Sequence, residues 1–99
     1  MYASMTTVKI RSDQTAEATR IWQEEILPVN RTLPGWKGAE LFTDAQTGEG
    51  VAINFYETVA DVNTVESSGA FQQLMAKLVP LMVAPPQRKV YELTGQARQ

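Results

Sequence analysis

Cysteine and histidine are both absent from the 99-residue sequence. Without cysteine, the protein has no disulfide, no thiolate nucleophile and no cysteine-ligated zinc or iron–sulfur cluster. Without histidine, it has no Ser-His-Asp triad and no imidazole ligand for a metal ion or a haem. These two absences exclude sites built on thiols or imidazoles, whereas carboxylate, amide and phenol groups are among those that remain.

A strong charge of one sign is also lacking. The sequence has 9 Lys and Arg residues against 11 Asp and Glu residues, a net charge of −2. Such a chain has no basic excess to attract nucleic acid or an anionic membrane, so we expect neither as a partner. The longest apolar stretch, residues 78–84, contains Pro80 and is too short to span a bilayer. Residues 1–11 lack the features of a signal peptide, so we expect a cytoplasmic protein.

The apolar content that is present suits one globular domain. Hydrophobic residues make up 43% of the chain, which is typical of a folded protein rather than a disordered one. A chain of this length buries only about two-thirds of its unfolded surface, so a partner subunit would enlarge its core. We predict a single domain over residues 1–95, followed by a polar tail at residues 96–99.

Alternation and turn residues mark four β-strands. The strands are predicted at residues 1–11, 36–44, 50–58 and 89–94. Residues 45–49 form a short connection that contains a glycine, so the two middle strands should pair as a hairpin. Gly95 begins a frayed end of the chain.

Two helical segments lie between the strands. The first follows the N-cap residues Ser12 and Asp13, is kinked at Pro28 and ends at Pro34-Gly35. Its apolar stripe is Ala18, Trp22, Ile26, Val29 and Leu33. The second begins weakly at residues 59–68 and continues with the stripe Phe71, Leu74, Met75, Leu78, Val79 and Met82. The order β-α-β-β-α-β predicts an α+β ferredoxin-like domain with a four-stranded antiparallel sheet and both helices on one face.

The hairpin strands present two different sets of alternating side chains. One set is uniformly apolar: Ala39, Leu41, Val51, Ile53 and Phe55. The other is mixed: Trp36, Gly38, Glu40, Phe42, Ala52, Asn54 and Tyr56. Either the helices cover the apolar set and an aromatic cluster faces water, or a second subunit covers the apolar set and the mixed set lies beneath the helices. We prefer the second arrangement, in which polar groups border a cavity because burying them without partners is unfavourable.

Several short segments resemble the antibiotic-biosynthesis-monooxygenase-like family. They are Pro34-Gly35-Trp36-Lys37-Gly38, the strand end Asn54-Phe55-Tyr56-Glu57-Thr58, Ala60-Asp61, and Ser68-Gly69-Ala70-Phe71. The resemblance extends from about Met5 to Gly95. It implies a dimeric α/β barrel, in which two sheets pack face to face with the helices outside. It also implies a pocket between sheet and helices in each subunit, and an apolar or aromatic small molecule as ligand.

Three residues of the mixed set are candidates for catalysis. Asn54 could stabilise an oxyanion, or its amide could satisfy a neighbouring backbone group. Tyr56 stands where similar sequences often carry a tryptophan; its phenol could donate to a substrate oxygen, or its ring could simply pack under the helices. Glu40, enclosed by aromatic groups, could act as a general base, or it could be a solvated carboxylate on an edge strand.

Five residues are candidates for the pocket wall: Thr6, Trp22, Trp36, Phe71 and Met75. Each has a structural alternative, because apolar stripes usually form the core and threonine is a good strand former. The aspartates are scattered through caps and turns, so no metal site is predicted.

The resemblance implies a monooxygenase that needs no cofactor and acts on a small phenol or quinol of polyketide type. In such chemistry the deprotonated substrate itself reduces dioxygen, and the protein positions it and stabilises its oxyanion. The alternative is a dimer that binds a small molecule without catalysis, because fold does not fix function. Haem degradation is the weakest candidate, because the haem-degrading members hold iron through a histidine; ligation by tyrosine or methionine is conceivable.

Overall fold

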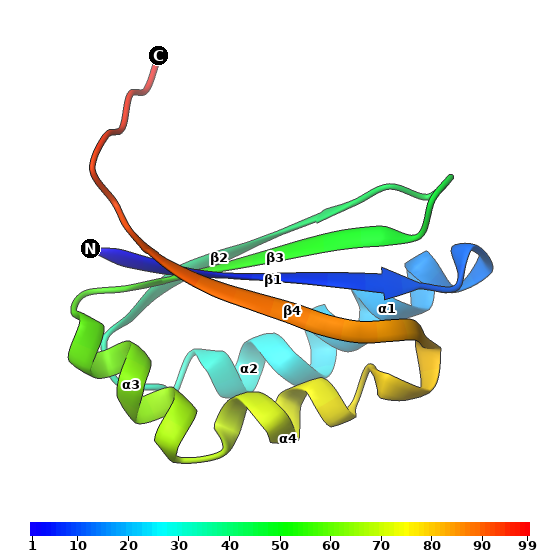
Figure 1. Ribbon diagram of the computed structural model, residues 1–99, viewed down its shortest axis with the longest axis horizontal. Coiled ribbons are helices and arrows are strands. Elements are labelled where there is room, and N and C mark those ends of the chain that lie inside the picture. The colour runs from blue at the N-terminus through cyan, green and yellow to red at the C-terminus, as the bar shows by residue number, and fades with distance from the viewer.

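A four-stranded antiparallel sheet carries all the helices on one face in the computed structural model, which describes residues 1–99 (Figure 1). The strands are β1 (Tyr2–Ile10), β2 (Trp36–Thr43), β3 (Glu49–Tyr56) and β4 (Met82–Glu92). They lie in the order β2-β3-β1-β4, so β2 and β4 are the edges of an open sheet. The predicted α+β ferredoxin-like order is confirmed.

The helices connect the strands in two groups. Between β1 and β2 lie η1 (Ser12–Gln14), α1 (Thr15–Ile21), η2 (Trp22–Ile26) and α2 (Leu27–Asn30). Between β3 and β4 lie α3 (Val59–Ser67), α4 (Ala70–Ala76) and η3 (Val79–Leu81). None of these helices is long and apolar enough to cross a membrane.

Strand β1 behaves as its alternation predicts. Its inward side chains are buried against the helices: Ser4, Thr6, Val8 and Ile10. The alternate residues Met5 and Lys9 are exposed. Since β1 pairs with β3 on one side and β4 on the other, it forms the centre of the sheet.

The first helical group contains a π-helical turn, η2, immediately before Pro28. The Leu27 N–H donates to the carbonyl of Trp22, five residues back. Proline has no N–H, and its ring crowds the carbonyl four residues earlier, so a wider turn at this point relieves the conflict. The kink expected at Pro28 therefore takes the form of one π-turn.

The apolar stripe of this helical group ends differently from the prediction. Val29 is 41% exposed, whereas Asn30 is only 4% exposed. The inward positions are Ala18, Trp22, Ile26 and Asn30, a strict spacing of four. A polar residue thus takes the last buried position of the helix.

A β-bulge in β2 reverses the predicted faces of this strand. Trp36 lies opposite Tyr56 and Gly38 opposite Phe55, so Lys37 is an extra residue. One extra residue moves every later side chain of a strand to the other face. Beyond the bulge, Ala39 and Leu41 pack against the helix-side core. Their predicted place on the uncovered face is wrong.

Strand β4 begins seven residues earlier than predicted, at Met82 instead of Lys89. Pro85 and Pro86 lie inside it. Proline is tolerated in an edge strand because one side of that strand has no hydrogen-bonding neighbour. The pairing with β1 is also irregular between Thr7 and Ile10, which accommodates the two prolines.

The buried side chains form two clusters between sheet and helices. The larger cluster includes Val8, Ile10, Ile21, Trp22, Ile26, Leu74 and Leu78. The smaller one joins Tyr56 to Val62 and Val65 of α3, a helix that begins with a capping box formed by Thr58 and Asp61. Both clusters lie on the helix side, so the opposite face of the sheet is bare (Figure 1).

We name this bare side the uncovered face. Its larger apolar side chains, placed there by the strand register, are Met5, Phe42, Val51, Ile53, Phe55 and Tyr91. Phe42 is 56% exposed and Tyr91 48% exposed. The chain after Glu92 leaves the sheet on this same side, away from the helices (Figure 1).

Two glycines with the same positive φ allow a matched stability test. Gly48 and Gly69 both have φ +79°, but a Cβ at Gly48 would lie 1.9 Å from the Ile10 carbonyl oxygen, whereas a Cβ at Gly69 would meet nothing. Gly69→Ala should lower the free energy of unfolding by about 1 kcal/mol, the cost of a left-handed alanine. Gly48→Ala should lower it by about 3 kcal/mol or more, because the Ile10 strand end must also move. Urea denaturation measures both values, and equal losses would contradict the predicted clash.

Candidate functional site

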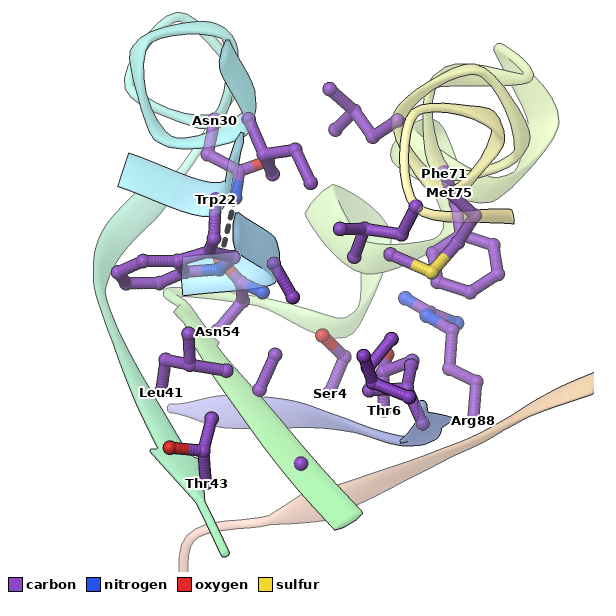
Figure 2. Close-up of a pocket in the computed structure, with 18 of the residues that line it drawn as sticks. Ser4, Thr6, Trp22, Asn30, Leu41, Thr43, Asn54, Phe71, Met75 and Arg88 are labelled. Carbon is purple, nitrogen blue, oxygen red and sulfur yellow. Dashed lines mark hydrogen bonds between the residues drawn. The ribbon is translucent and has the colours of Figure 1, made fainter. Parts of the chain in front are cut away.

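A cavity of about 60 Å³ lies between the sheet and the two helical groups (Figure 2). Its floor comes from the four strands, chiefly β1 and β3, and its walls come from the helices α1, η2, α2, α3 and α4. This volume exceeds the roughly 10–15 Å³ that one water molecule needs. It is well below the roughly 300–1,000 Å³ typical of pockets for drug-sized ligands. A ligand of several rings would therefore require some wall side chains to move.

The most constrained polar group of the site is the amide of Asn54. Its Oδ1 accepts a hydrogen bond of 3.0 Å from the Trp36 indole Nε1 and one of 3.1 Å from Asn30 Nδ2. The indole nitrogen can only donate, so the atom facing it must be the amide oxygen. The Asn54 Nδ2 makes no hydrogen bond to the protein. Figure 2 shows the Asn30–Asn54 contact at one side of the cavity.

This hydrogen-bond pattern turns the Asn54 amide into a fixed donor. Asn54 lines the cavity, and no fully buried polar side-chain atom lacks a partner, so its unpaired Nδ2 keeps accessible surface. The two accepted bonds prevent the amide from flipping without leaving two donors unpaired. The cavity therefore contains an N–H donor whose direction is set by α2 and β2.

Tyr56 lies two residues further along the same face of β3. Its side chain lines the cavity and the residue is 2% exposed. Burial raises the pKa of the Tyr56 phenol above its usual 10, an effect that the nearby Arg88 charge partly opposes. At neutral pH the hydroxyl is therefore protonated and can donate a hydrogen bond.

Two hydroxyl groups of β1 complete the floor. Ser4 and Thr6 are each 3% exposed and line the cavity. Neither hydroxyl makes a hydrogen bond to another protein group. Figure 2 shows both side chains directed from β1 towards the space beneath the helices. Buried hydroxyls normally have a partner, so these two are available to a bound molecule or to water.

Arg88 is the only charged residue that lines the cavity. Its side chain is 11% exposed and extends inward from β4. The guanidinium pairs with Glu66 of α3 and lies 5.0 Å from the centre of the Phe71 ring. This contact set holds a cation at the opposite side of the cavity from Asn54 (Figure 2).

The prediction that Glu40 faces the cavity is wrong. Because of the bulge at Lys37, Glu40 lies opposite Ile53 on the uncovered face and is exposed. No carboxylate lines the cavity. Glu40 is thus the solvated edge-strand carboxylate that the alternative interpretation described.

The other predicted site residues lie around the cavity. Thr6, Trp22, Phe71 and Met75 line it together with Asn54 and Tyr56. Trp36 does not line the cavity; its indole holds Asn54 and its ring packs in the smaller core cluster. The catalytic and binding roles assigned to these residues stay predictions.

Three site residues were missed in the sequence. Asn30 follows Ile26 by four residues, so a strict spacing of four would have found it. Ser4 has the same strand parity as Thr6 and carried an equal signal. Arg88 was hidden, because the final strand was expected to begin one residue after it.

The fold and the site together define an α+β protein of ferredoxin-like order with a partly polar cavity between sheet and helices. No family model matches the sequence, and none of the curated proteins matches it. Solved structures do match, at low sequence identity.

Three of these structures illustrate the likeness. Rv0793 from Mycobacterium tuberculosis has a TM-score of 0.73 and 20% identity, with 98% of each chain covered. A structure named antibiotic biosynthesis monooxygenase has a TM-score of 0.74 and 14% identity, covering 96% of this chain and 100% of that one. A monooxygenase from the gene ActVA-Orf6 of Streptomyces coelicolor, in complex with Nanaomycin D, has a TM-score of 0.75 and 12% identity over 99% of this chain and 91% of its own.

These matches support the resemblance to the antibiotic-biosynthesis-monooxygenase-like family. At identities of 20% and below, they establish the shared fold. The activity of this chain is a separate question, which depends on the side chains of its own cavity.

The raised pKa of Tyr56 predicts a specific pH dependence of stability. Above pH 10 the unfolded chain loses the phenol proton while the folded chain keeps it, so the folded state binds more protons and its stability falls as pH rises. The difference in unfolding free energy between wild type and Tyr56→Phe should be constant well below pH 10. Above pH 10 the wild type should lose stability relative to the variant. Urea denaturation across this pH range measures the difference. A pH-independent difference would contradict burial of the phenol.

Proposed function

We propose that the protein is a cofactor-independent monooxygenase that oxidises a small aromatic phenol, quinol or enol in the cavity between sheet and helices. The observation that carries this proposal is the orientation of the Asn54 amide. Its oxygen accepts two hydrogen bonds, and its Nδ2 makes none to the protein. A matching structure named a monooxygenase and solved in complex with Nanaomycin D supports the reaction class.

The reaction needs an electron-rich anion and dioxygen. Anthrone serves as the test substrate. Loss of a proton from its CH2 carbon, which lies opposite the carbonyl group, gives an enolate. The enolate reduces dioxygen, and the reduced oxygen then bonds to that CH2 carbon. The products are anthraquinone and water: one oxygen atom is bonded to carbon and the other leaves as water. Both C–H bonds of that carbon are lost, so the substrate supplies all four electrons. No external reductant is required.

In this proposal the residues of the cavity act by stabilising the enolate oxygen. The Asn54 Nδ2 and the protonated Tyr56 hydroxyl are two donors on the same face of β3. Donors already oriented towards a developing oxyanion lower the barrier without reorganising during the reaction. Their effect is to lower the pKa of the bound substrate, so that its proton passes to water.

The proposed reaction uses no general base from the protein, although the sequence had suggested Glu40 for this role. Glu40 is exposed on the uncovered face and no other carboxylate lines the cavity. The reaction therefore suits substrates that ionise readily, such as enols, polyphenols and ketones with an acidic C–H bond like that of anthrone, and not those whose C–H bonds are much less acidic.

The lack of a carboxylate in the cavity favours a second candidate function, the non-catalytic binding of a small molecule. A cavity with apolar walls and a few polar groups is sufficient for binding. In this case the Asn54 and Tyr56 donors would orient a ligand without activating it. Binding without oxygen consumption would identify this second function.

Oxygen consumption with anthrone tests the first function. We expect Asn54→Asp and Tyr56→Phe each to lower kcat by about 100-fold, as loss of one oxyanion donor does in other enzymes. The aspartate can still accept hydrogen bonds from Trp36 and Asn30, so this change removes the donor while keeping both acceptor contacts. An oxygen electrode and the appearance of anthraquinone measure the reaction.

Two matched variants serve as controls for this measurement. Asn63→Asp makes the same chemical change on the exposed surface of α3, and Tyr91→Phe removes a phenol from the uncovered face. Both should keep the wild-type kcat. Wild-type rates in Asn54→Asp and Tyr56→Phe would contradict the proposed oxyanion site.

We further infer that two copies pair through the uncovered face. Six large or medium-sized apolar side chains occupy this face, and patches of this kind mark interfaces. Relative to the sequence prediction, Val51, Ile53 and Phe55 remain in the interface. Ala39 and Leu41 leave it, because the bulge turns them towards the helices.

A charge placed in the centre of this face should separate the two copies. We expect Ile53→Glu to sediment at the mass of one 11.0 kDa chain, and wild type at the mass of two. Val79→Glu is the control, because Val79 is a branched residue that is 55% exposed and lies in η3, outside the strands that form the uncovered face. A wild type that sediments as a single chain would overturn the interface.

A further inference from the structure

We propose that the cavity selects an acidic aromatic ligand, whose anionic group is bound by Arg88 while an oxygen at its other end meets Asn54. The role of Asn54 in this inference rests on the proposed function. The new element is the class of molecule that the cavity accepts. Its support is a continuous line of polar side chains across the floor of the cavity.

The strand register creates this line, which we call the polar track. Asn54 of β3 lies directly opposite Ser4 of β1. Ser4 and Thr6 are two residues apart on one face of β1, and Thr6 lies directly opposite Arg88 of β4. The track thus crosses three strands diagonally, with an amide donor at one end and a guanidinium at the other (Figure 2).

The length of the polar track matches an aromatic molecule with polar groups at both ends. Across the sheet, Asn54 and Arg88 are separated by two strand spacings of about 4.8 Å each. Along the strands they are separated by two residues, each with a rise of about 3.4 Å. Their Cα atoms are therefore roughly 12 Å apart on the diagonal. Trp22, Phe71 and Met75 supply apolar walls above the track, which suits the faces of a ring system.

Arg88 has unused binding capacity. Its hydrogen bond to Glu66 uses one terminal nitrogen, which donates to Oε1. A guanidinium has five N–H donors in a rigid fork that fits a carboxylate through two parallel bonds. The Glu66 contact and the Phe71 ring hold the fork in place, so little side-chain entropy is lost when it binds an anion.

The charge of Arg88 is incompletely balanced inside the cavity. The Glu66 side chain is 48% exposed, so water screens it, whereas the Arg88 side chain is 11% exposed. No other charged residue lines the cavity. A cation in apolar surroundings, with its counter-ion at the surface, leaves a positive potential within the cavity. An anionic ligand would restore the balance.

A purely structural role for Arg88 is the competing explanation. The Arg88–Glu66 pair joins β4 to α3, and such a link could exist only to hold the helix on the sheet. A structural role predicts equal effects on acidic and neutral ligands. A binding role predicts an effect on the acid alone.

The experiment compares a matched pair of probes, 6-hydroxy-2-naphthoate and its neutral amide, 6-hydroxy-2-naphthamide. The two share ring, hydroxyl and shape and differ in charge. Calorimetric titration without turnover should show wild type binding the acid at least tenfold more tightly than the amide, because charged hydrogen bonds are the stronger ones. Equal affinities, or no binding of either probe, would overturn the proposal.

Three variants separate binding from structure. Arg88→Met should weaken binding of the acid by about tenfold to a hundredfold and change binding of the amide by less than twofold. Arg88→Lys, which keeps the charge without the fork, should retain part of the preference for the acid. Arg20→Met is the control, because Arg20 lies on the exposed surface of α1 and its loss changes the net charge equally. Equal losses for acid and amide in Arg88→Met would assign Arg88 a structural role only.

The outcome is distinguishable from a failure of the proposed function. A preference for the acid that depends on Arg88, without oxygen consumption by any ligand, would support this inference and remove the monooxygenase. Oxygen consumption with anthrone, without a preference for the acid, would support the monooxygenase and overturn the inference about Arg88.

Discussion

The bulge at Lys37 is the constraint on which the rest of the site depends. In an uninterrupted strand, Trp36 and Leu41 would lie on opposite faces, because they are five residues apart. The extra residue turns both towards the helices. The Trp36 indole then reaches Asn54, Leu41 closes the core, and Glu40 is turned away. The contribution of β2 to the cavity therefore follows from one local irregularity.

A second irregularity provides the other half of the Asn54 contact. The π-turn before Pro28 adjusts the helix so that Asn30 continues the buried positions of Trp22 and Ile26. Asn30 and Trp36 then donate to the same oxygen from two different elements. Helix and sheet are joined here by a polar side chain, which stands in line with the apolar side chains of Trp22 and Ile26. The free side of the Asn54 amide is directed into the cavity as a result.

Sequence reasoning succeeded wherever a strand or helix was regular. The alternation of β1 and β3 assigned Thr6, Asn54 and Tyr56 to the correct face, because period two survives in strands without bulges. It failed in β2, where the bulge reverses the faces, and at Asn30, where an apolar stripe was extended to Val29. Each failure lies where a single extra residue or a proline interrupts the period.

The sequence by itself determined the order of the elements, the central strands and the main apolar core, because those features depend on local periodicity. Only the tertiary structure decided that Arg88 lies inside the cavity. Pro85 and Pro86 look like the end of any regular element, yet an edge strand needs hydrogen bonds on one side only. The pairing of Arg88 with Thr6 across β1 and β4 is a contact between distant parts of the chain. Register of this kind arises from packing, which no local pattern encodes.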